Sequence, residues 1–166
     1  MSSVKPIPEG FHTLTPHIVV KDGAEAIEFY KKAFGAEQIG CSMLCPEGKV
    51  MHAELKIGNS MIMIAQENPQ WGCLSPATIG NTSVTLSLYV ENSDEAFEKA
   101  VNAGATVKMP LADMFWGDRY GQVTDPSGHH WAICTHIKDL TNEEIAKASE
   151  EAMAQYKEKG ECAANA

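Results

Sequence analysis

The sequence predicts an α+β fold in which two copies of one β-α-β-β-β unit form a curved mixed sheet around a cleft, followed by a C-terminal helix. The first observation is an internal repeat: a shift of 70 residues places Thr15 on Thr85 and Gly58 on Gly128. The second is that strand-like and helix-like apolar patterns follow in the same order in each copy. Matches in one order on one series of elements indicate a duplicated supersecondary unit.

In the first copy, a β-branched apolar run over 14–20 predicts the opening strand. The apolar positions between Ala26 and Phe34 have helical spacing, and Gly35 is expected to end that helix. Three further strands are expected, separated by turns at 46–48 and 58–59, and they cover 38–44, 50–57 and 60–65.

The second copy repeats this order with a strand over 84–90 and a helix that Ser93 is expected to cap and that runs to Asn102. Its remaining strands are expected over 105–109, 122–124 and 129–135. Beyond the repeat, Thr141 and Glu144 form a capping box that opens the C-terminal helix.

These patterns predict one domain over 12–145. It consists of module one (12–66), a linker rich in Pro and Gly (67–82) and module two (83–138). The C-terminal helix is expected over 139–160, and 161–166 are expected to be a frayed tail.

Composition excludes several classes of partner. The chain of 166 residues has 13 basic and 22 acidic side chains, a net charge of -9, which disfavours nucleic acid and anionic lipid as partners. The longest apolar runs are far shorter than the roughly 20 residues that span a bilayer, and no secretory leader opens the chain. Five cysteines without a Cys-x-x-Cys pair favour reduced thiols, so we expect a cytoplasmic protein.

Three stretches carry a resemblance to a known family. They are His52-Ala53-Glu54-Leu55, the segment from Phe115 to Gly121 that reads FWGDRYG, and Asp125-Pro126 followed by Gly128-His129 and Trp131. With the paired modules, they resemble the vicinal oxygen chelate superfamily, which contains glyoxalase I, bleomycin-resistance proteins, fosfomycin-resistance enzymes and extradiol dioxygenases, and within it the PhnB-like group. The resemblance implies a ligand-binding cleft and a homodimer. Fold alone does not select among the superfamily's chemistries.

Active members of that superfamily hold a divalent metal on four inward strand positions occupied by His, Gln or Glu. Spacing from Asp22, Asn92 and Asp125 maps three of these positions to Thr15, Thr85 and Ala132, and the fourth falls within 62–64. Threonine is a weak donor, and alanine and isoleucine offer none. We therefore expect no metal at the usual positions and no cofactor.

A displaced metal site is the alternative. Because residues two apart on a strand share a face, His17, His52, Glu54 and His130 are candidates to converge on a divalent cation. The competing interpretation is that they are separate polar groups satisfied by neighbours or water. If His52 and Glu54 line the cleft, they are the candidate catalytic residues, with Glu54 as a general base.

Ligand-binding candidates gather in the aromatic FWGDRYG stretch. Arg119 offers a planar fork for a carboxylate or a phosphonate, and Trp116 offers a stacking surface. The alternative is an Asp118–Arg119 ion pair that fixes the loop. Tyr120, Tyr89 and His17 complete the candidate set, although tyrosines more often serve in packing.

Three functions remain open on the sequence. The first is a cleft that binds a small organic molecule without a metal, as the bleomycin-resistance proteins of the family do by sequestration. The second is a metal-dependent enzyme on the displaced site: a glyoxalase-like isomerase, lyase, transferase or dioxygenase. The third is a partner-binding module with a filled cleft, which the short side chains Thr15, Thr85 and Ala132 disfavour.

Overall fold

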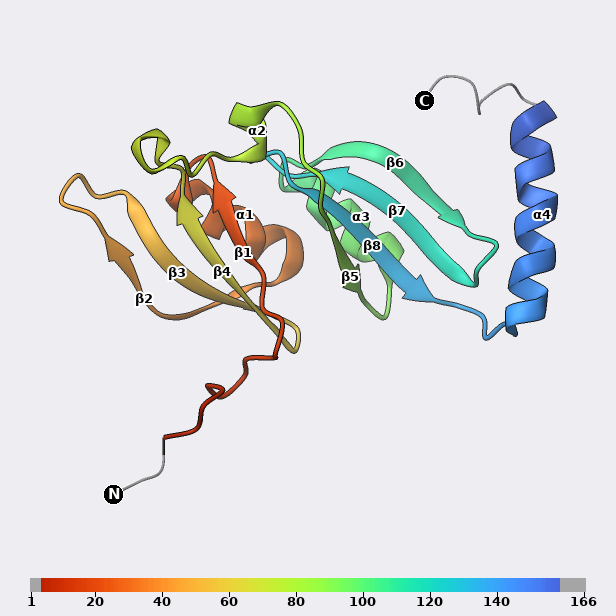
Figure 1. Ribbon diagram of the computed structural model, residues 1–166, viewed down its shortest axis with the longest axis horizontal. Coiled ribbons are helices and arrows are strands. Elements are labelled where there is room, and N and C mark those ends of the chain that lie inside the picture. The colour runs from red at the N-terminus through yellow and green to blue at the C-terminus, as the bar shows by residue number, and fades with distance from the viewer. Residues whose placement is uncertain (1–3, 159–166) are drawn as a thin grey trace.

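The computed structural model describes residues 4–158 and confirms the predicted fold class (Figure 1). Module one contains β1 (His17–Val20), α1 (Gly23–Phe34), β2 (Glu37–Leu44), β3 (Val50–Ile57) and β4 (Ser60–Gln66). Module two contains β5 (Thr85–Tyr89), α3 (Ser93–Asn102), β6 (Thr106–Asp113), β7 (Asp118–Thr124) and β8 (His130–His136). The two modules are therefore built from the same series of elements, as the repeat predicts.

The strands form two separate four-stranded sheets with the same topology. The orders are β1-β4-β3-β2 and β5-β8-β7-β6, with one parallel pair in each sheet, β1 with β4 and β5 with β8. Figure 1 shows the sheets side by side with α1 and α3 behind them. One face of each sheet is thus covered by the module's own helix, and the other is left open.

Several element boundaries differ from the prediction for local reasons. β1 begins at His17 rather than Leu14, directly after Pro16, which has no backbone N–H to donate. Asn92, not Ser93, caps α3, because its side-chain oxygen accepts the backbone N–H of Glu95 at 3.2 Å. β6 runs on through Pro110 to Asp113, which is tolerated because β6 is an edge strand.

The linker contains two short helical turns, a 3-10 turn over Pro69–Trp71 and α2 over Pro76–Ile79. The C-terminal helix α4 spans Asn142–Glu158 and stands at the far end of module two (Figure 1). The capping box at its start is formed: Thr141 and Glu144 exchange hydrogen bonds of 2.8–3.2 Å. The predicted tail over 161–166 lies outside the described residues. No helix within 4–158 is long and apolar enough to cross a membrane.

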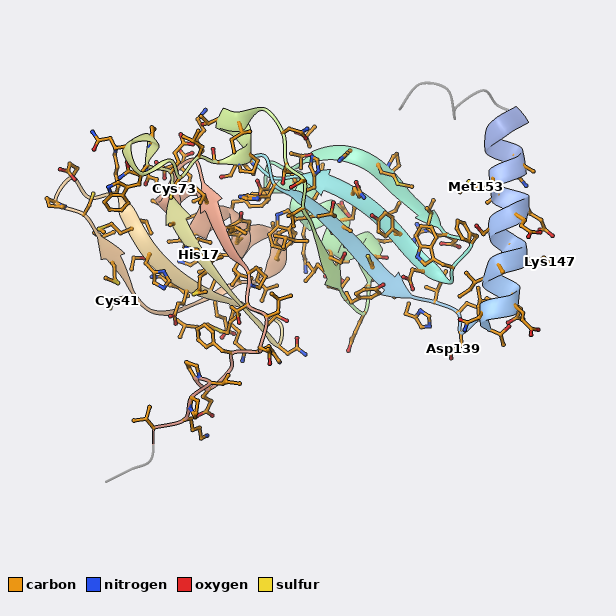
Figure 2. All side chains as sticks on the ribbon, in the orientation of Figure 1. His17, Cys41, Cys73, Asp139, Lys147 and Met153 are labelled. Carbon is orange, nitrogen blue, oxygen red and sulfur yellow. The ribbon has the colours of Figure 1, made fainter. Side chains whose placement is uncertain are left out.

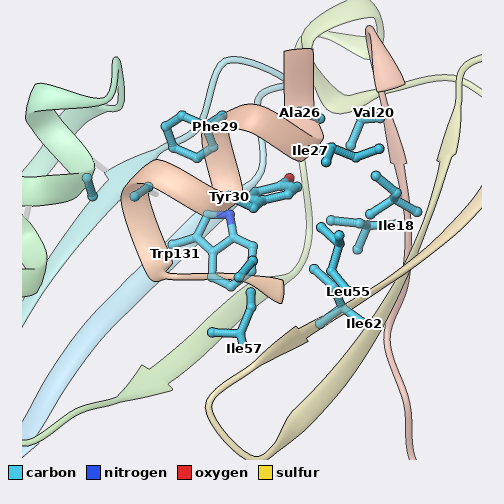
Figure 3. Close-up of a cluster of buried hydrophobic side chains, with 14 of the residues drawn as sticks. Ile18, Val20, Ala26, Ile27, Phe29, Tyr30, Leu55, Ile57, Ile62 and Trp131 are labelled. Carbon is cyan, nitrogen blue, oxygen red and sulfur yellow. The ribbon is translucent and has the colours of Figure 1, made fainter. Parts of the chain in front are cut away.

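The hydrophobic core is continuous between the modules. Trp131 on β8 of module two lies against α1 of module one, with ring centroids 4.6 Å from Phe34 and 5.6 Å from Tyr30 (Figure 3). Trp131 is 3% exposed and belongs to the same buried cluster as Leu55 and Ile57 of β3. This packing, together with α1 against α3, holds the modules together through their covered faces and leaves both open faces outward.

Candidate functional site

Side chains alternate along each strand, so every second residue of the two sheets points away from the helices. The first open face belongs to module one, and its residues alternate with the core residues Ile18, Ala53 and Ile64. We define it as His17, Val19, Ile39, Met43, His52, Glu54, Lys56, Met63 and Ala65.

The second open face belongs to module two, and its residues alternate with the core residues Val123, Trp131 and Ile133. We define it as Thr85, Ser87, Tyr89, Lys108, Asp118, Tyr120, Gln122, Thr124, His130, Ala132, Cys134 and His136. All but one of the sequence-predicted site residues that the strands carry lie on one of these two faces. The exception is Arg119, on the covered side of the second sheet. Thr15 and Trp116 lie outside the strands, just before β1 and β7.

His17, His52 and Glu54 meet on the first open face. Nε2 of His52 is 3.5 Å from Oε1 of Glu54, and the rings of His17 and His52 are 5.8 Å apart in a T-shaped arrangement. Strand pairing explains this, because Met63 on β4 pairs with both His17 and Glu54 and so places β1 close to β3. The side chains of His52 and Glu54 are 30% and 34% exposed, so both are accessible.

A hollow of about 930 Å³ lies beside this group. His17, Val19 and Ala65 form part of its wall, and the linker segment that contains Trp71 and Cys73 forms another part. Figure 2 shows His17 and Cys73 on the first sheet and the linker next to it. Trp71 is 67% exposed, which leaves an aromatic surface available to a ligand at the edge of the hollow.

His130, the fourth candidate for a displaced metal site, lies on the second open face and not with the other three. Its Nδ1 accepts a 2.9 Å hydrogen bond from Nζ of Lys108. Among the described residues, no three His, Cys, Asp or Glu side chains are arranged to hold a metal ion. The structure therefore brings together three of the four candidates, and the displaced site remains a prediction that rests on His17, His52 and Glu54.

Asp118 is the centre of a polar cluster on the second open face. It is 5% exposed, and its carboxylate accepts hydrogen bonds from the Tyr89 hydroxyl (2.8 Å), Nε1 of Trp116 (3.2 Å) and Nδ1 of His136 (2.8 Å). Burial by itself raises the pKa of Asp118, but these three hydrogen bonds outweigh burial and hold the pKa below its ordinary value. Asp118 is therefore an anion at neutral pH.

The same hydrogen bonds shift the pKa values of the groups that donate them. The bond to Asp118, with a smaller contribution from burial, raises the pKa of Tyr89 to about 12, so its hydroxyl stays protonated. The pKa of His136 is raised because Asp118 and Asp139 both accept from its ring. Burial raises the pKa of Cys134 to about 11, which keeps this thiol from acting as a nucleophile near neutral pH.

Two of the predicted ligand-binding aromatics join this cluster. The ring of Trp116 packs edge-on against Tyr120 with centroids 5.6 Å apart, and Gln122 donates to the Tyr120 hydroxyl. Ala132, which pairs with Gln122 and Ser87, is fully buried between them. The surface of the second open face around Ala132 is thus formed by hydroxyl, amide and aromatic groups, which cover the small side chain beneath them.

Arg119 does not lie on either open face. Its guanidinium holds both oxygens of Asp94 on α3 at 2.6 Å and contacts Asp113 at 2.8 Å. The expected Asp118–Arg119 ion pair is wrong, because the two adjacent side chains point to opposite sides of β7. Arg119 therefore joins strand β7 to α3 and β6, on the covered side of the sheet.

The four positions that the resemblance maps to metal ligands carry unsuitable side chains. Thr85 and Ala132 lie on the second open face, and Thr15 uses its hydroxyl to donate to the carbonyl of His12 at 3.0 Å. On β4 the residue that faces outward is Met63, since Ile62 and Ile64 belong to the core. One thioether, one alanine and two threonines do not fit a divalent cation that prefers imidazole and carboxylate donors.

Sequence reasoning missed Asp118, His136, Gln122 and Lys108 as members of the second open face. The first three could have been predicted from strand alternation. Asp118 and Gln122 are each two residues from Tyr120 and share its side of β7, and His136 is four residues from Ala132 and shares its side of β8. Alternation along β6 also places Lys108 on this face, because Val107 pairs with the core residue Val123. The register shift between Val107 and Met109, which the sequence pattern does not reveal, leaves Lys108 unpaired on β6.

Comparisons with known proteins agree with this fold. An uncharacterised Mycobacterium tuberculosis protein, Rv0887c, is 44% identical over 138 residues, which cover 81% of each chain. The crystal structure of TioX from Micromonospora sp. ML1 superimposes with a TM-score of 0.60 and 26% identity, over 76% of this chain and 99% of TioX.

The Arabidopsis thaliana protein At5g48480 is 33% identical over 127 residues, which cover 72% of this chain and 75% of that protein. Its X-ray structure gives a TM-score of 0.59 over 74% of this chain and 98% of that one. A family model matches residues 10–133 of this sequence. By that match, the chain belongs to the Glyoxalase/Bleomycin resistance protein/Dioxygenase superfamily.

Proposed function

We propose that this chain is a PhnB-like member of the superfamily that binds a small organic molecule on its open faces without the usual metal. The observation that carries the proposal is the donor set at the four metal positions: Thr15, Thr85, Ala132 and Met63. A site that had kept metal chemistry would keep imidazole or carboxylate there. The open faces keep instead the groups that bind organic molecules, namely aromatic rings and single hydrogen-bonding side chains.

The proposed binding surface joins apolar and polar groups. On the first open face, Val19, Ala65 and Trp71 offer apolar contact within the hollow of about 930 Å³, a volume within the range of small-molecule pockets. On the second open face, Tyr89 and Gln122 offer hydrogen-bonding groups beside the small side chain of Ala132. A ligand held by both faces would have an apolar body and a few polar groups.

We further propose that a second copy of the chain completes the cleft. The first open face exposes Ile39 and Met43 at 40% and 61%, and Tyr89 on the second open face is 62% exposed. Apolar side chains gathered on one sheet face are typical of a protein–protein interface. A homodimer in which open faces meet would cover them and turn two surfaces into a closed cleft. Light scattering coupled to size exclusion tests this, with a mass of about two chains expected and a monomer contradicting it.

Ligand binding is tested on metal-free protein. A library of neutral, cationic and anionic small molecules is screened by thermal shift, and the affinities of the hits are measured by isothermal titration. We expect saturable binding that Ser87→Trp weakens by about tenfold or more, because Ser87 is exposed on the second open face and the added ring would occupy the surface beside Gln122. Ala146→Trp adds the same ring on an exposed position of α4 and is expected to leave affinity unchanged.

The binding proposal fails if no molecule binds saturably, or if Ser87→Trp and Ala146→Trp behave alike. Trp71→Ala tests the first open face in the same way. Because Trp71 is exposed, its loss is expected to lower affinity without lowering the melting temperature. An unchanged affinity would restrict the binding surface to module two and contradict the two-face proposal.

A metal-dependent enzyme is the second candidate, and the presence of His17, His52 and Glu54 on one open face favours it. The three side chains are not arranged as metal ligands within the described residues, so a cation would have to draw them together. In this proposal His17 and His52 would hold a divalent cation that polarises a bound carbonyl compound, and Glu54 would accept a proton from that compound as the general base. Chelator-stripped protein is incubated with nickel, manganese, iron(II) or zinc, desalted and measured by mass spectrometry. About one metal per chain, lost in His52→Ala and kept in His12→Ala, supports the enzyme, and no retained metal contradicts it.

A further inference from the structure

One end of the second open face carries basic and hydroxyl side chains. The strand pairing places Thr85, His130 and Thr124 in one row across β5, β8 and β7. Directly paired residues have Cβ atoms about 4.5–5.5 Å apart, so the two hydroxyls flank the imidazole. The acidic cluster around Asp118 lies at the opposite end of β7, six residues along the strand, which is about 20 Å.

Lys108 reaches this row from the edge strand. Val107 pairs with the core residue Val123, so alternation along β6 places Lys108 on the open face, and the register shift before Met109 leaves it without a partner on β7. Its ammonium crosses β7 and donates to Nδ1 of His130 at 2.9 Å. A cation therefore lies over this end of the sheet face.

The charge of Lys108 is not neutralised. Within residues 4–158 it forms no ion pair with a carboxylate. Asp125 is the carboxylate that acts on His130, but it is 4% exposed and bound to Tyr30 and Trp131. Burial and the nearby Lys108 lower the pKa of His130, which keeps the imidazole neutral at pH 7. Nζ of Lys108 lies 2.9 Å from Nδ1 and 3.4 Å from Nε2 of this neutral ring, so the imidazole holds the ammonium in place over the sheet face.

We propose that Lys108, His130, Thr85 and Thr124 form an anion-recognition subsite, and that the ligand of this protein is an organic anion whose carboxylate or phosphate group binds there. The inference rests on the proposed ligand-binding function and specifies its substrate class. The subsite offers one ammonium, held by the imidazole, and two hydroxyls, which suit the several acceptor oxygens of an oxyanion. Ser87 and Gln122 lie in the next row of the sheet, so the body of the ligand extends over them.

The test uses simple probes at constant ionic strength. Inorganic phosphate and benzoate are titrated into the full chain, with benzamide as the uncharged counterpart of benzoate, and binding is followed through the ring resonances of His130 by NMR. We expect saturable shifts with one or both anions and binding of benzamide about tenfold weaker than that of benzoate. A response to phosphate alone or to benzoate alone identifies which of the two oxyanions the subsite takes.

Two lysine variants decide whether the effect is local. Lys108→Gln is expected to weaken anion binding by about tenfold, while Lys147→Gln, the same charge change on the outer side of α4 (Figure 2), is expected to leave it unchanged. Equal losses in both variants, no loss in Lys108→Gln, or no shift of His130 would overturn the proposal. If neutral hits still bind and respond to Ser87→Trp, the ligand-binding function stands and the anion assignment alone fails. If nothing binds, both fail.

Discussion

The hydroxyl of Tyr30 on α1 donates a 2.7 Å hydrogen bond to Oδ2 of Asp125, in the turn that precedes β8. Tyr30 is 1% exposed and Asp125 is 4% exposed, and 95 residues separate them. Asp125 also accepts from Nε1 of Trp131 at 2.9 Å and from the backbone N–H groups of Ser127 and His129. A buried charge that is fully hydrogen-bonded in this way fixes module two against the helix of module one.

Tyr30→Phe is expected to lower the free energy of unfolding by about 1.5–3 kcal/mol, the usual value of a hydrogen bond to a charged group. The ring packing against Trp131 and Phe34 is kept, so the loss reports the hydroxyl alone. Urea denaturation at pH 7 measures it. Tyr89→Phe removes a hydroxyl that also donates to a carboxylate but belongs to a 62% exposed residue. Because water can replace that hydroxyl, Tyr89→Phe should lower the free energy of unfolding by less than Tyr30→Phe does. Equal decreases in the two variants would contradict the role given to burial.

The start of α3 provides a second prediction. Asn92 caps the helix, whereas Ser93 is 1% exposed and its hydroxyl has no hydrogen-bond partner among the described residues. Asn92→Ala is therefore expected to lower the free energy of unfolding by about 1 kcal/mol. Ser93→Ala is expected to be neutral or stabilising, since it removes a buried polar group that gains nothing in the fold.

Thermal and urea unfolding of the two single variants measure the difference. If Ser93 were the cap, as the sequence pattern first indicates, the order would be reversed, with Ser93→Ala the costly change. Stabilities that do not differ between the variants would contradict the capping geometry at Asn92.

The prediction succeeded where structure depends on neighbours in the chain. The start and end of α1, at Asp22 and Gly35, and the capping box at Thr141 follow from local hydrogen bonds and backbone conformation. The repeat also predicted that β5 through β8 copy β1 through β4, because a duplicated unit keeps its apolar pattern. The superfamily was inferred from the resemblance of three short stretches together with the paired modules, and it is confirmed.

The candidate site was predicted less completely because it depends on contacts between distant strands. His52 and Glu54 share a strand face, so their proximity was predictable, but the place of His17 beside them depends on the β1–β4 register. The separation of His130 from them follows from the formation of two sheets instead of one. The approach of Lys108 to His130 depends on the pairing of β6, β7 and β8, which lie far apart in the sequence.

Arg119 yields a third prediction, on ligand binding and stability together. It bridges Asp94 on α3 and Asp113 on β6, with side-chain exposures of 32%, 59% and 65%. Arg119→Gln is expected to lower the melting temperature by a few degrees, a modest loss because solvent screens exposed ion pairs. Affinity for any ligand of the open faces should not change, since the guanidinium lies on the covered side of the sheet.

A double-mutant cycle with Asp94→Asn separates the bridge from other effects of the substitution. If Arg119 acts through Asp94, the double variant loses less than the sum of the two single losses. A drop in ligand affinity with an unchanged melting temperature would instead return Arg119 to the ligand-binding set.

His136 supplies a prediction of pH dependence. Its ring donates to Asp118 at 2.8 Å and to Asp139 at 3.1 Å, and these carboxylates raise its pKa in the folded protein above the ordinary value near 6.5. A raised folded pKa means that the charged ring stabilises the fold fully below about pH 6.5 and that this stabilisation is lost as pH rises through the folded pKa. Asp118 contributes in another pH range. Because its pKa is lowered in the folded protein, the stabilisation it provides is fully present above about pH 3.9, the ordinary pKa of an aspartate, and is lost only in stronger acid.

The stability difference between the natural chain and His136→Gln should therefore be largest between about pH 5 and 6.5 and should shrink as pH rises above that range. Urea denaturation at half-unit pH steps measures the difference, and added salt should reduce it because the ring is half exposed. His12→Gln removes an imidazole that contacts no carboxylate in residues 4–158 and serves as the control, with little dependence on pH expected. A difference for His136→Gln that grows above pH 7 would mean that the neutral ring is the form the fold prefers, and the pairing with Asp118 and Asp139 would have to be abandoned.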